Sequence, residues 1–551
     1  MTKITNITIL GGGTSGWMSA TTLLSQFPDK KITLVESPNI STVGVGESTI
    51  PGMNNWLNFV GINYADFMPH CDATFKLSIA FKDWYRKDSG TFHTPFGPLN
   101  MAQYDFGPSG KQEHYDNFEV QLNHWHLKKI FYPETPVSEY AEWFYPSMAL
   151  INQNKSFLMN REERPTTVGF TNMDHAYQFD ATKFGLWLRD NYCKTRYSNN
   201  FTHILAEVKE IPLNDNGIEY LVLDNGQKLE ADLFIDCTGF KSLLLTETFN
   251  VPFQNITNII PNNYSWATKI PYKDPETQIV NYTNCTAIEN GWIWEIPLWS
   301  RMGAGYVFSD KFISTDNAQK EFKQGLIKKG YTNVDDLEYK LIPMRCGVQS
   351  NLWVKNTCAI GLSAGFIEPL HSNGLHNTHQ FLFNLCRTLA RDYISEWDRK
   401  EYTTKCQDDF NGLVSIVALN YGLAHRDDTE YWRDLQNNTW ADDLFHNTAS
   451  GFSKYLSEAY YNKNFLQKFH PHSPDLLHMV AAGMNWNPMD KHSIKYYQPS
   501  YSNREYIEQV VNVNTILGVK SRMEERRMRW HEHVKDDPSP YQYLKDKFYM
   551  N

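Results

Sequence analysis

A glycine-rich turn near the start of the chain has the residue types and spacing that bind a pyrophosphate. An apolar run over residues 7–10 ends in Gly11, and Gly13 and Gly16 follow at the fingerprint spacing. In a dinucleotide fingerprint the first glycine permits a tight turn, the second lets the backbone approach the pyrophosphate, and the third lets helix and strand pack closely. Glu36, at the end of the next apolar run, can accept a hydrogen bond from a ribose hydroxyl. The pattern predicts a bound dinucleotide but does not distinguish FAD from NAD.

A lysine among apolar residues is the next group that could do chemistry. Lys76 follows Phe75 and precedes Leu77 and Ile79. Such a lysine either extends its ammonium group to solvent along an apolar surface or is held inside the protein to act on a substrate. The local pattern alone favours the first interpretation.

Two further loops combine glycines with small polar residues. In residues 43–51 two glycines alternate with valines before a polar patch and Pro51. This loop either lays its backbone against a flat ligand ring or is an ordinary loop at a strand edge, and the pattern favours neither. Residues 359–374 contain another turn from an apolar run into glycine, followed by Glu368-Pro369 and a small polar segment.

Two tryptophans stand two residues apart in a segment predicted to be a strand. Trp292 and Trp294 therefore lie on the same face of that strand, where they would form a flat hydrophobic wall. Ordinary core packing explains the same pattern, and the two interpretations are compatible.

The elements that position the glycine turn follow from hydrophobic periodicity. Residues 7–10 and 32–35 are predicted strands, and the helical pattern between them ends at Pro28. A later helix is predicted to begin after Asp180, which has the side chain of a good N-cap.

The rest of the chain changes from strands to helices. Residues 203–236 predict strands with a hairpin turn at 224–226. The last of these strands ends in another glycine turn, which would bring the chain back to the nucleotide site. Residues 264–310 predict antiparallel strands, and a mainly helical region follows from about residue 375. Residues 85–170, with little periodicity, predict a long irregular insertion.

Composition excludes several classes of function. The 551-residue chain can hold more than one core, and its net charge of −10 predicts no broad nucleic-acid surface. Because we find no apolar run long enough for a membrane span and no room for a secretory signal before the first strand, we expect a cytoplasmic protein. The eight scattered cysteines predict reduced, buried thiols. The charge-dense segment 520–533, with His531 and His533, predicts a solvated helix face without a metal site.

Taken together, these stretches resemble the flavin-dependent tryptophan halogenase family. The resemblance runs from residue 3 to about residue 433. The W-x-W-x-I-P hexapeptide at 292–297 is specific to that family, whereas many flavoproteins share the glycine fingerprint. The other matching segments are 11–16, 44–51, 75–81, 179–180, 236–240, 365–370, 420–421 and 426–433.

The resemblance implies reduced FAD, a halide ion, O2 and a separate flavin reductase. In that family hypohalous acid passes through the protein to a lysine, and Lys76 matches that lysine. The tryptophan segment, Trp292 and Trp294 with Pro297, would screen the flavin from a small aromatic substrate. The resemblance assigns halide binding to Asn373 and Gly374, and cofactor binding to Gly11, Gly13, Thr14, Ser15, Gly16, Glu36, Gly44, Gly46, Ser48, Thr49, Gly361 and Gly374.

The polar loop departs from the family pattern at one catalytic position. Those enzymes carry Glu-Pro-Leu-Glu-Ser-Thr-Gly, and in this chain His371 replaces the second glutamate before Ser372. A second departure is Leu362, where many flavoproteins have an aspartate. Histidine can accept a proton, but as imidazolium it would repel Lys76. We therefore expect Lys76, His371 and Ser372 to act on an indole or another electron-rich aromatic rather than free tryptophan, with bromide or iodide preferred to chloride.

The predicted fold class is α/β (α+β): a Rossmann-like FAD-binding module of the flavin monooxygenase type with an inserted antiparallel sheet and a mainly helical C-terminal region. The predicted domains are 1–390, with insertions at about 85–170 and 255–340, and 391–551. One alternative is an FAD-dependent aromatic monooxygenase, which the tryptophan wall disfavours. The other is a catalytically impaired flavin-binding relative, which the presence of Lys76 disfavours. Since only one dinucleotide fingerprint is complete, NAD(P)H is not expected to bind tightly.

Overall fold

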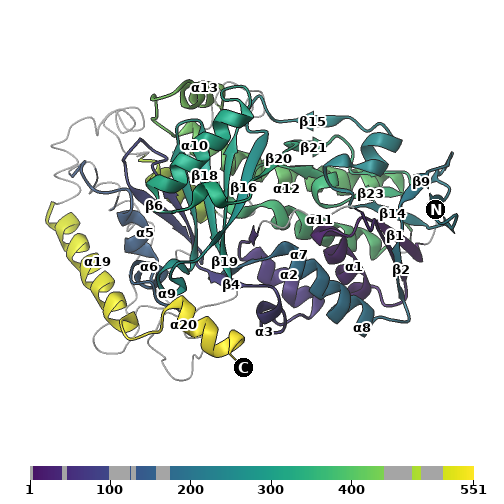
Figure 1. Ribbon diagram of the computed structural model, residues 1–551, viewed down its shortest axis with the longest axis horizontal. Helices are drawn as coiled ribbons and strands as arrows, with labels where there is room; N and C mark the ends of the chain where they lie inside the picture. Colours follow the sequence, from purple (N-terminus) through teal and green to yellow (C-terminus); the bar gives the residue numbers. More distant parts are fainter. Residues whose placement is uncertain are drawn as a thin grey trace.

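The structure is a computed structural model that describes residues 4–39, 46–97, 125, 129, 132–156, 174–391, 393–439, 474–485 and 513–550. Two large sheets organise it. A mostly parallel sheet lies toward one end of the molecule, and an antiparallel sheet lies near the middle (Figure 1).

The first sheet has six strands in the order β22-β23-β14-β1-β2-β8. Its central strand β1 pairs in parallel with both β14 and β2, and β22 alone runs antiparallel to its neighbour. The near-continuous apolar character of β1 fits a strand that is covered on both faces. The strands are β1 (Asn6–Leu10), β2 (Lys31–Glu36), β8 (Phe201–Leu205), β14 (Leu233–Asp236), β22 (Trp353–Val354) and β23 (Thr357–Ala359).

The helix α1 (Thr14–Gln26) follows β1 directly and packs its apolar stripe into the core. Trp17, Leu23 and Leu24 are all buried. The chain then turns at Pro28 and enters β2. The predicted strand–turn–helix–strand unit is therefore confirmed, and it places the glycine turn at the carboxyl end of β1, where nucleotides bind in open α/β sheets.

The second sheet has seven strands in the order β20-β16-β19-β18-β17-β5-β6 and is antiparallel except where β17 meets β5. The helix α10 (Thr315–Lys328) covers one face through Phe322 and Leu326, which pack with Ile293 of β18. The strands are β5 (Ser78–Lys82), β6 (Thr91–Pro95), β16 (Tyr264–Pro271), β17 (Tyr282–Ile288), β18 (Gly291–Pro297), β19 (Arg301–Phe308) and β20 (Lys340–Pro343). The antiparallel prediction for 264–310 is confirmed.

A small third sheet has the order β3-β7-β4, and its strand β4 contacts β17 of the antiparallel sheet. Its strands are β3 (Glu47–Ser48), β4 (Thr74–Lys76) and β7 (Ala176–Phe179). Because β5 begins two residues after Lys76, the same stretch of chain ends one sheet and starts another. This junction fixes the position of Lys76.

The remaining helices lie between and after the strands along the chain. In α12 a capping box between Ser395 and Asp398 fixes the first turn. The longer helices are α2 (Gly52–Val60), α11 (Gly374–Leu389), α12 (Glu396–Gly422), α13 (Glu430–Thr439), α16 (Pro474–Gly483) and α19 (Val513–Val534). The shorter ones include α3 (Tyr64–Phe67), α5 (Glu139–Phe144), α6 (Ser147–Asn152), α7 (Ala181–Trp187), α8 (Lys194–Arg196), α9 (Pro275–Gln278) and α20 (Pro540–Leu544).

The remaining elements are short pieces between these. The strands are β9 (Val208–Glu210), β10 (Leu213–Asn214), β11 (Gly217–Ile218), β12 (Leu221–Leu223), β13 (Lys228–Leu229), β15 (Phe253–Asn255), β21 (Gly347–Gln349) and β24 (Gly365–Phe366). The 3-10 and π segments are η1 (Met68–His70), η3 (Leu188–Cys193), η4 (Gly239–Lys241), η5 (Leu243–Thr248), η6 (Val334–Asp336), η7 (Gly361–Ser363), η8 (Leu370–Ser372) and η11 (Lys545–Tyr549).

Several local predictions are confirmed. Asp180 caps α7 by accepting hydrogen bonds from the backbone of Thr182 and Lys183. Residues 224–226 turn the chain from β12 into β13. All eight cysteines are buried and none is in a disulfide.

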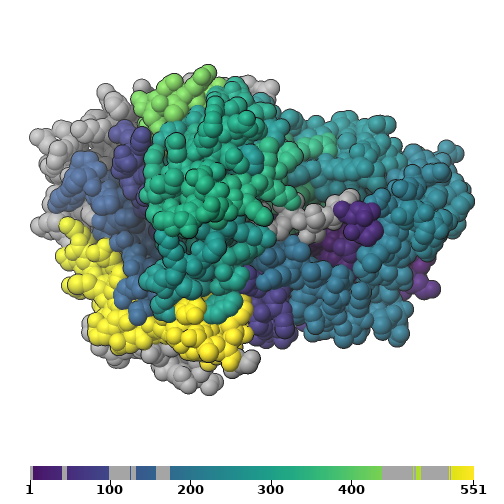
Figure 2. Space-filling model, viewed as in Figure 1, coloured from purple at the N-terminus to yellow at the C-terminus, as the bar shows by residue number. Residues whose placement is uncertain are grey.

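Two local predictions are wrong. Residues 91–95, inside the predicted irregular insertion, form β6 of the antiparallel sheet; much of 85–170 lies outside the described residues. The helix α19 is not a wholly solvated face, because Arg526 is buried and donates to the carbonyl oxygen of Trp143 in α5. Figure 2 shows the yellow C-terminal residues along one edge of the molecule, against the blue segment that holds α5 and α6.

No helix within the described residues is both long and apolar enough to cross a bilayer. The same residues contain no group of three or more His, Cys, Asp or Glu side chains arranged to hold a metal ion. The domain boundaries at 1–390 and 391–551 stay a prediction.

Candidate active site

Lys76 is fully buried, so the solvent-exposed interpretation is wrong. Its Nζ atom donates to the carbonyl oxygen of Thr49 at 2.9 Å and to Ser372 Oγ at 2.8 Å. The Phe96 ring centroid lies 5.3 Å from Nζ. The lysine was predicted to reach solvent because its sequence neighbours are apolar, but its polar partners come from segments far away in the chain.

Burial also changes the protonation of this lysine. Removal from water disfavours the charged form and lowers the pKa of Lys76 to about 7. In the described part of the chain no carboxylate forms an ion pair with Lys76 that would restore its usual value. Near neutral pH both the ammonium and the amine are therefore populated, and this group can both donate and regain a proton.

A chain of hydroxyl groups runs from Lys76 into the protein. Ser372 Oγ donates to Ser48 Oγ at 3.1 Å, and Ser48 Oγ lies 2.6 Å from Thr283 Oγ1. Thr283 in turn donates to Gln178 Oε1 at 2.9 Å. These contacts join β3, β7, β17 and the loop before α11, and they hold Ser372 in one orientation toward Lys76.

The loop that carries Ser372 has an unusual backbone. His371 and Ser372 both adopt the left-handed conformation, with φ of 62° and 57°. A residue other than glycine held in such a conformation costs about 1–3 kcal/mol, and such strain is concentrated at functional sites. The turn sends adjacent side chains to different partners, Ser372 to Lys76 and His371 to Asn420.

His371 is buried and neutral at neutral pH. Burial, with a smaller contribution from the charge on Lys76, lowers the pKa of His371 to about 4, against the opposing hydrogen bond with Asn420. Its Nε2 lies 2.7 Å from Asn420 Oδ1, and its ring centroid lies 5.0 Å from that of Phe81. The expected repulsion between an imidazolium and Lys76 is therefore absent at neutral pH.

Glu368 supports the same loop from behind and was not among the predicted site residues. Tyr421 Oη and Asn262 Nδ2 each donate to its carboxylate at 2.6 Å. Burial raises the pKa of Glu368 to about 7, although both hydrogen bonds oppose the shift. Glu368-Pro369 and Asn420-Tyr421 stood out in the sequence, but nothing there showed that the two segments meet.

Asn373 closes the loop at the start of α11. Its Nδ2 donates to the carbonyl oxygens of Glu368 and Leu370, both at 2.8 Å. Both hydrogens of the Asn373 side-chain amide are therefore used within the loop. At Asn373 and Gly374 this leaves the main-chain amides as the groups that could hold the predicted halide. That assignment stays a prediction.

The glycine turn is shaped for a ligand that comes close to the backbone. A Cβ atom at Gly11 would lie 2.2 Å from the carbonyl oxygen of Cys237, and one at Gly16 would lie 1.9 Å from that of Gly11. At Gly13, in contrast, a Cβ would meet no protein atom within 4 Å. Gly13 is also the N-cap of α1 and provides no side-chain cap, so the first amides of the helix can face an anion. These residues fit a pyrophosphate.

Several other residues predicted to bind the cofactor lie near this turn and have contacts of their own. Glu36 ends β2 beneath Gly12 and lies 2.9 Å from His203 Nε2 through its Oε2 atom. Thr14 Oγ1 donates to the carbonyl oxygen of Ala181. A Cβ at Gly361 would lie 2.5 Å from that of Ser15, so the turn at Gly361 lies beside the glycine turn at residues 11–16.

Of the loop at residues 43–51, only its second half is described. Gly46 has φ of 108°, and a Cβ there would meet Leu298 at 3.3 Å. Ser48 and Thr49, predicted to bind cofactor, contact the Lys76 network, and their cofactor role stays a prediction. Gly44 lies outside the described residues.

The tryptophan wall has the register that the sequence predicts. Trp292 and Trp294 project from the same face of β18 into the large core, whereas Ile293 packs beneath α10. Trp292 is fully buried, with its ring centroid 6.0 Å from that of Trp84. Pro297 accepts a hydrogen bond from Thr74, two residues before Lys76, at 2.6 Å. The wall is therefore core packing, and its screening role stays a prediction.

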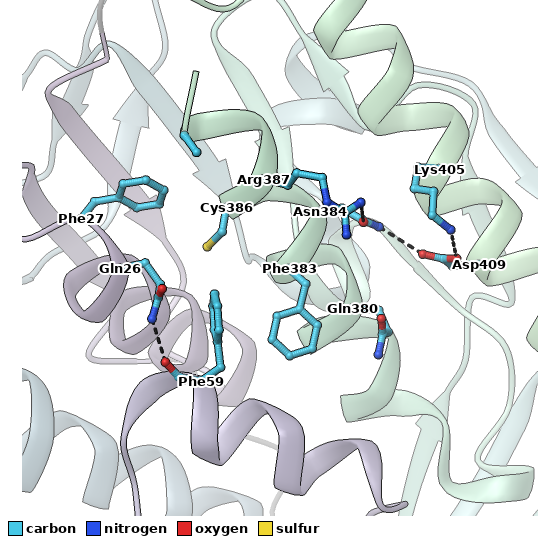
Figure 3. Close-up of a pocket in the computed structure, with 11 residues that line it drawn as sticks. Gln26, Phe27, Phe59, Gln380, Phe383, Asn384, Cys386, Arg387, Lys405 and Asp409 are labelled. Atoms are coloured by element: carbon cyan, nitrogen blue, oxygen red, sulfur yellow. Dashed lines mark hydrogen bonds and ion pairs between the residues drawn. The ribbon is translucent and has the colours of Figure 1, made fainter. Parts of the chain in front are cut away.

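A hollow of about 690 Å³ opens elsewhere on the molecule (Figure 3). It lies between α1, α2, α11 and α12, with Phe59 and Phe383 in edge-to-face contact at 5.1 Å. Phe383 is nine residues along α11 from Gly374, or about 14 Å at the helical rise. None of the lining residues belongs to the Lys76 network, so this hollow is separate from the lysine site.

The glycine turn at the edge of a parallel sheet and the enclosed lysine beside an antiparallel sheet define a dinucleotide-binding enzyme. The family model described as "Tryptophan halogenase" matches residues 6–494. The tryptophan 6-halogenase SttH of Streptomyces toxytricini is 31% identical over 457 residues, which cover 80% of this chain and 82% of SttH.

Solved structures agree with the sequence comparison. The apo structure of VirX1 has a TM-score of 0.84 at 30% identity and covers 100% of both chains. The crystal structure of SttH has a TM-score of 0.78 at 27% identity, over 98% of this chain and 99% of that one. The chain belongs to the tryptophan halogenase family and is a flavin-dependent halogenase. The predicted family and FAD-binding Rossmann-like fold are confirmed, and membership implies FAD, a halide and O2.

Proposed function

We propose that this enzyme transfers halogen from hypohalous acid to an indole or another electron-rich aromatic, and that Lys76 directs the transfer. The burial of Lys76 carries this proposal. An ammonium group has three N–H donors. Thr49 and Ser372 accept two of them in the described residues, and the third can hold the oxygen of hypohalous acid.

Lys76 can stabilise the negative charge on the oxygen that leaves hypohalous acid. As the aromatic carbon attacks the halogen, negative charge develops on the oxygen, and a fixed cationic donor stabilises that charge most in a water-poor site. The ammonium then passes its proton to the oxygen, which leaves as water. The pKa of Lys76, about 7, makes this proton available near neutral pH.

The glycine turn supplies the cofactor site in this proposal. Reduced FAD, with O2 and halide, provides the hypohalous acid. Gly13 and the first amides of α1 would hold the pyrophosphate, and Glu36 would accept a hydrogen bond from a ribose hydroxyl. The main-chain amides at Asn373 and Gly374 would hold the halide.

Two observations bear on the substrate. The relative SttH is named as a tryptophan 6-halogenase, which supports an indole as the aromatic group. His371 replaces the glutamate of the family loop, which argues against the free amino acid as the leading substrate. Mass spectrometry of reactions with a panel of indoles and phenols, a flavin reductase and each halide tests this function. A mass increase of one halogen supports it, and added oxygen would favour the monooxygenase alternative.

We expect bromide or iodide to give more product than chloride at equal concentration. A neutral histidine polarises hypohalous acid less than a carboxylate would, and chloride is the hardest of the three halides to oxidise. Product mass measured with each halide in turn checks the order. A strong preference for chloride would show that the histidine substitution does not control the choice.

The purified chain is expected to be inactive with NAD(P)H alone and to need reduced flavin from a separate reductase. The sequence holds one complete dinucleotide fingerprint, at residues 11–16. The loss of NADH absorbance, measured with and without an added reductase, checks this. Rapid oxidation of NADH by the pure chain would contradict the need for a partner.

A further inference from the structure

The imidazole of His371 has one partnered and one unpartnered nitrogen. The side chain is 5% exposed. Its Nε2 lies 2.7 Å from Asn420 Oδ1, while Nδ1 is buried without a hydrogen-bond partner in the described part of the chain. A buried polar atom without a partner is uncommon and calls for an explanation, such as a ligand or a reacting group.

The Asn420 contact decides which nitrogen carries the hydrogen. In the orientation that the structure gives the Asn420 amide, Oδ1 faces Nε2 and Nδ2 is buried without a partner in the described residues. An amide oxygen can only accept, so in this orientation Nε2 carries the hydrogen. In the neutral ring the other nitrogen, Nδ1, then has the free lone pair. Burial and the nearby charge of Lys76 keep the ring neutral by holding the pKa of His371 at about 4.

The strained turn brings the His371 ring close enough to Lys76 for the charge of the lysine to act on it. His371 and Ser372 are consecutive left-handed residues, and Ser372 contacts Lys76 directly. The Asn420 side chain comes from α12 and is fully buried, so it approaches the ring from a separate rigid element. The turn and the helix together hold the imidazole with Nε2 toward Asn420.

We propose that His371 Nδ1 accepts the proton that the aromatic substrate loses, and that Asn420 is a positioning residue that fixes the Nε2–H tautomer. This inference rests on the proposed function. In this proposal His371 accepts the proton that a carboxylate at this position would be expected to accept. Asn420 then has a role that its position in α12 alone does not indicate.

The proton transfers balance. In the first step the arene takes the halogen from hypohalous acid and becomes the halogenated ring cation. The Lys76 ammonium gives its proton to the departing oxygen, which forms water and leaves the Lys76 amine. The C–H bond at the halogenated carbon then breaks, its electron pair returns to the ring, and Nδ1 takes the proton. The imidazolium returns that proton to the more basic Lys76 amine, so the sum is hypohalous acid plus arene to halogenated arene plus water.

The first test is the nitrogen-15 NMR spectrum of the enzyme labelled in histidine, with a His371→Gln variant to identify the signal. We expect Nδ1 of His371 to give the resonance of an unprotonated nitrogen and Nε2 that of a protonated one. A protonated Nδ1 in the parent enzyme at neutral pH would overturn the proposal whatever the variants do.

The second test replaces Asn420 by leucine, with Asn384→Leu as a matched control because Asn384 is a similarly buried amide outside the lysine site. We expect kcat to fall about 10–10²-fold, as when an orienting partner of a histidine is removed, with little change in KM for the arene. A primary isotope effect from deuterium at the halogenated carbon should appear in Asn420→Leu and not in the control. In a chain that already carries His371→Gln, Asn420→Leu should not lower kcat any further.

A third variant guards against simple loss of structure. Asn420→Asp keeps an acceptor oxygen toward Nε2 and should retain the Nε2–H signal that Asn420→Leu loses. If Asn420→Leu halogenates at the parent rate with no isotope effect, the proposal is wrong. A parent enzyme that halogenates no member of the aromatic panel would instead remove the proposed function.

Discussion

Replacement of Lys76 by methionine is expected to lower the rate of halogenation by about 10²–10³-fold, the usual cost of removing one charge-stabilising donor. Methionine keeps much of the volume of the lysine but cannot donate to the departing oxygen. FAD binding should be unchanged, because Lys76 donates to Thr49 and Ser372, and neither residue lies in the glycine turn. Halogenated product measured by mass, at equal FAD content, checks the rate.

The same lysine should give the parent enzyme a pH dependence. The ammonium form is the donor, and it is lost as the pH rises through a pKa of about 7. The halogen-transfer rate measured in single turnover should therefore fall above that pH. The fall should be missing from the residual activity of Lys76→Met.

Lys30→Met is a matched control for the Lys76 variant. Lys30 is also buried and also donates to a main-chain carbonyl, that of Ile4 at 2.8 Å, but it lies after α1 and outside the site. It should retain the parent rate. Equal product from Lys76→Met and the parent would remove Lys76 from the mechanism and point to freely diffusing hypohalous acid.

Replacement of Gly13 by valine is expected to abolish retention of FAD without unfolding the protein. A Cβ at Gly13 would meet no protein atom within 4 Å, and its φ of −74° suits any residue. The added side chain would nevertheless fill the space in which the pyrophosphate approaches the backbone. FAD affinity can be measured by the quenching of flavin fluorescence on binding.

Gly412→Val is the control for the glycine change. A Cβ at Gly412, in α12, also meets no atom within 4 Å, so valine adds the same volume away from the turn. This variant should bind FAD like the parent. Undiminished FAD affinity in Gly13→Val would reject the placement of the pyrophosphate at this turn.

The sequence predicts the nucleotide-binding unit well because its signals are local. The apolar runs of β1 and β2, the glycines between them and Pro28 after α1 all act on neighbouring residues. The register of Trp292 and Trp294 follows from the two-residue period of a strand in the same way.

The lysine site is less predictable because its contacts are long-range. Lys76 is 27 residues from Thr49 and 296 from Ser372, and its burial depends on those partners. The contact of His371 with Asn420 spans 49 residues and two elements. Periodicity shows that α12 is a helix but not which loop its buried asparagine meets.

Arg526 shows the same limit on a helix surface. The charge-dense pattern of residues 520–533 predicts solvent on every polar side, yet α5 packs against α19 and buries the guanidinium of Arg526. A hydrogen bond to a carbonyl oxygen makes that burial tolerable. The partner helix α5 lies nearly four hundred residues away along the sequence, so no local pattern around Arg526 predicts the contact.

The central claim is that hypohalous acid reacts while held by Lys76 inside the protein. The most direct measurement is the yield of halogenated indole in the presence of excess methionine, which consumes any hypohalous acid that escapes into solution. If the enclosed lysine directs the reaction, the yield measured by mass spectrometry stays unchanged as methionine is added. A yield that falls toward zero with increasing methionine would contradict the account.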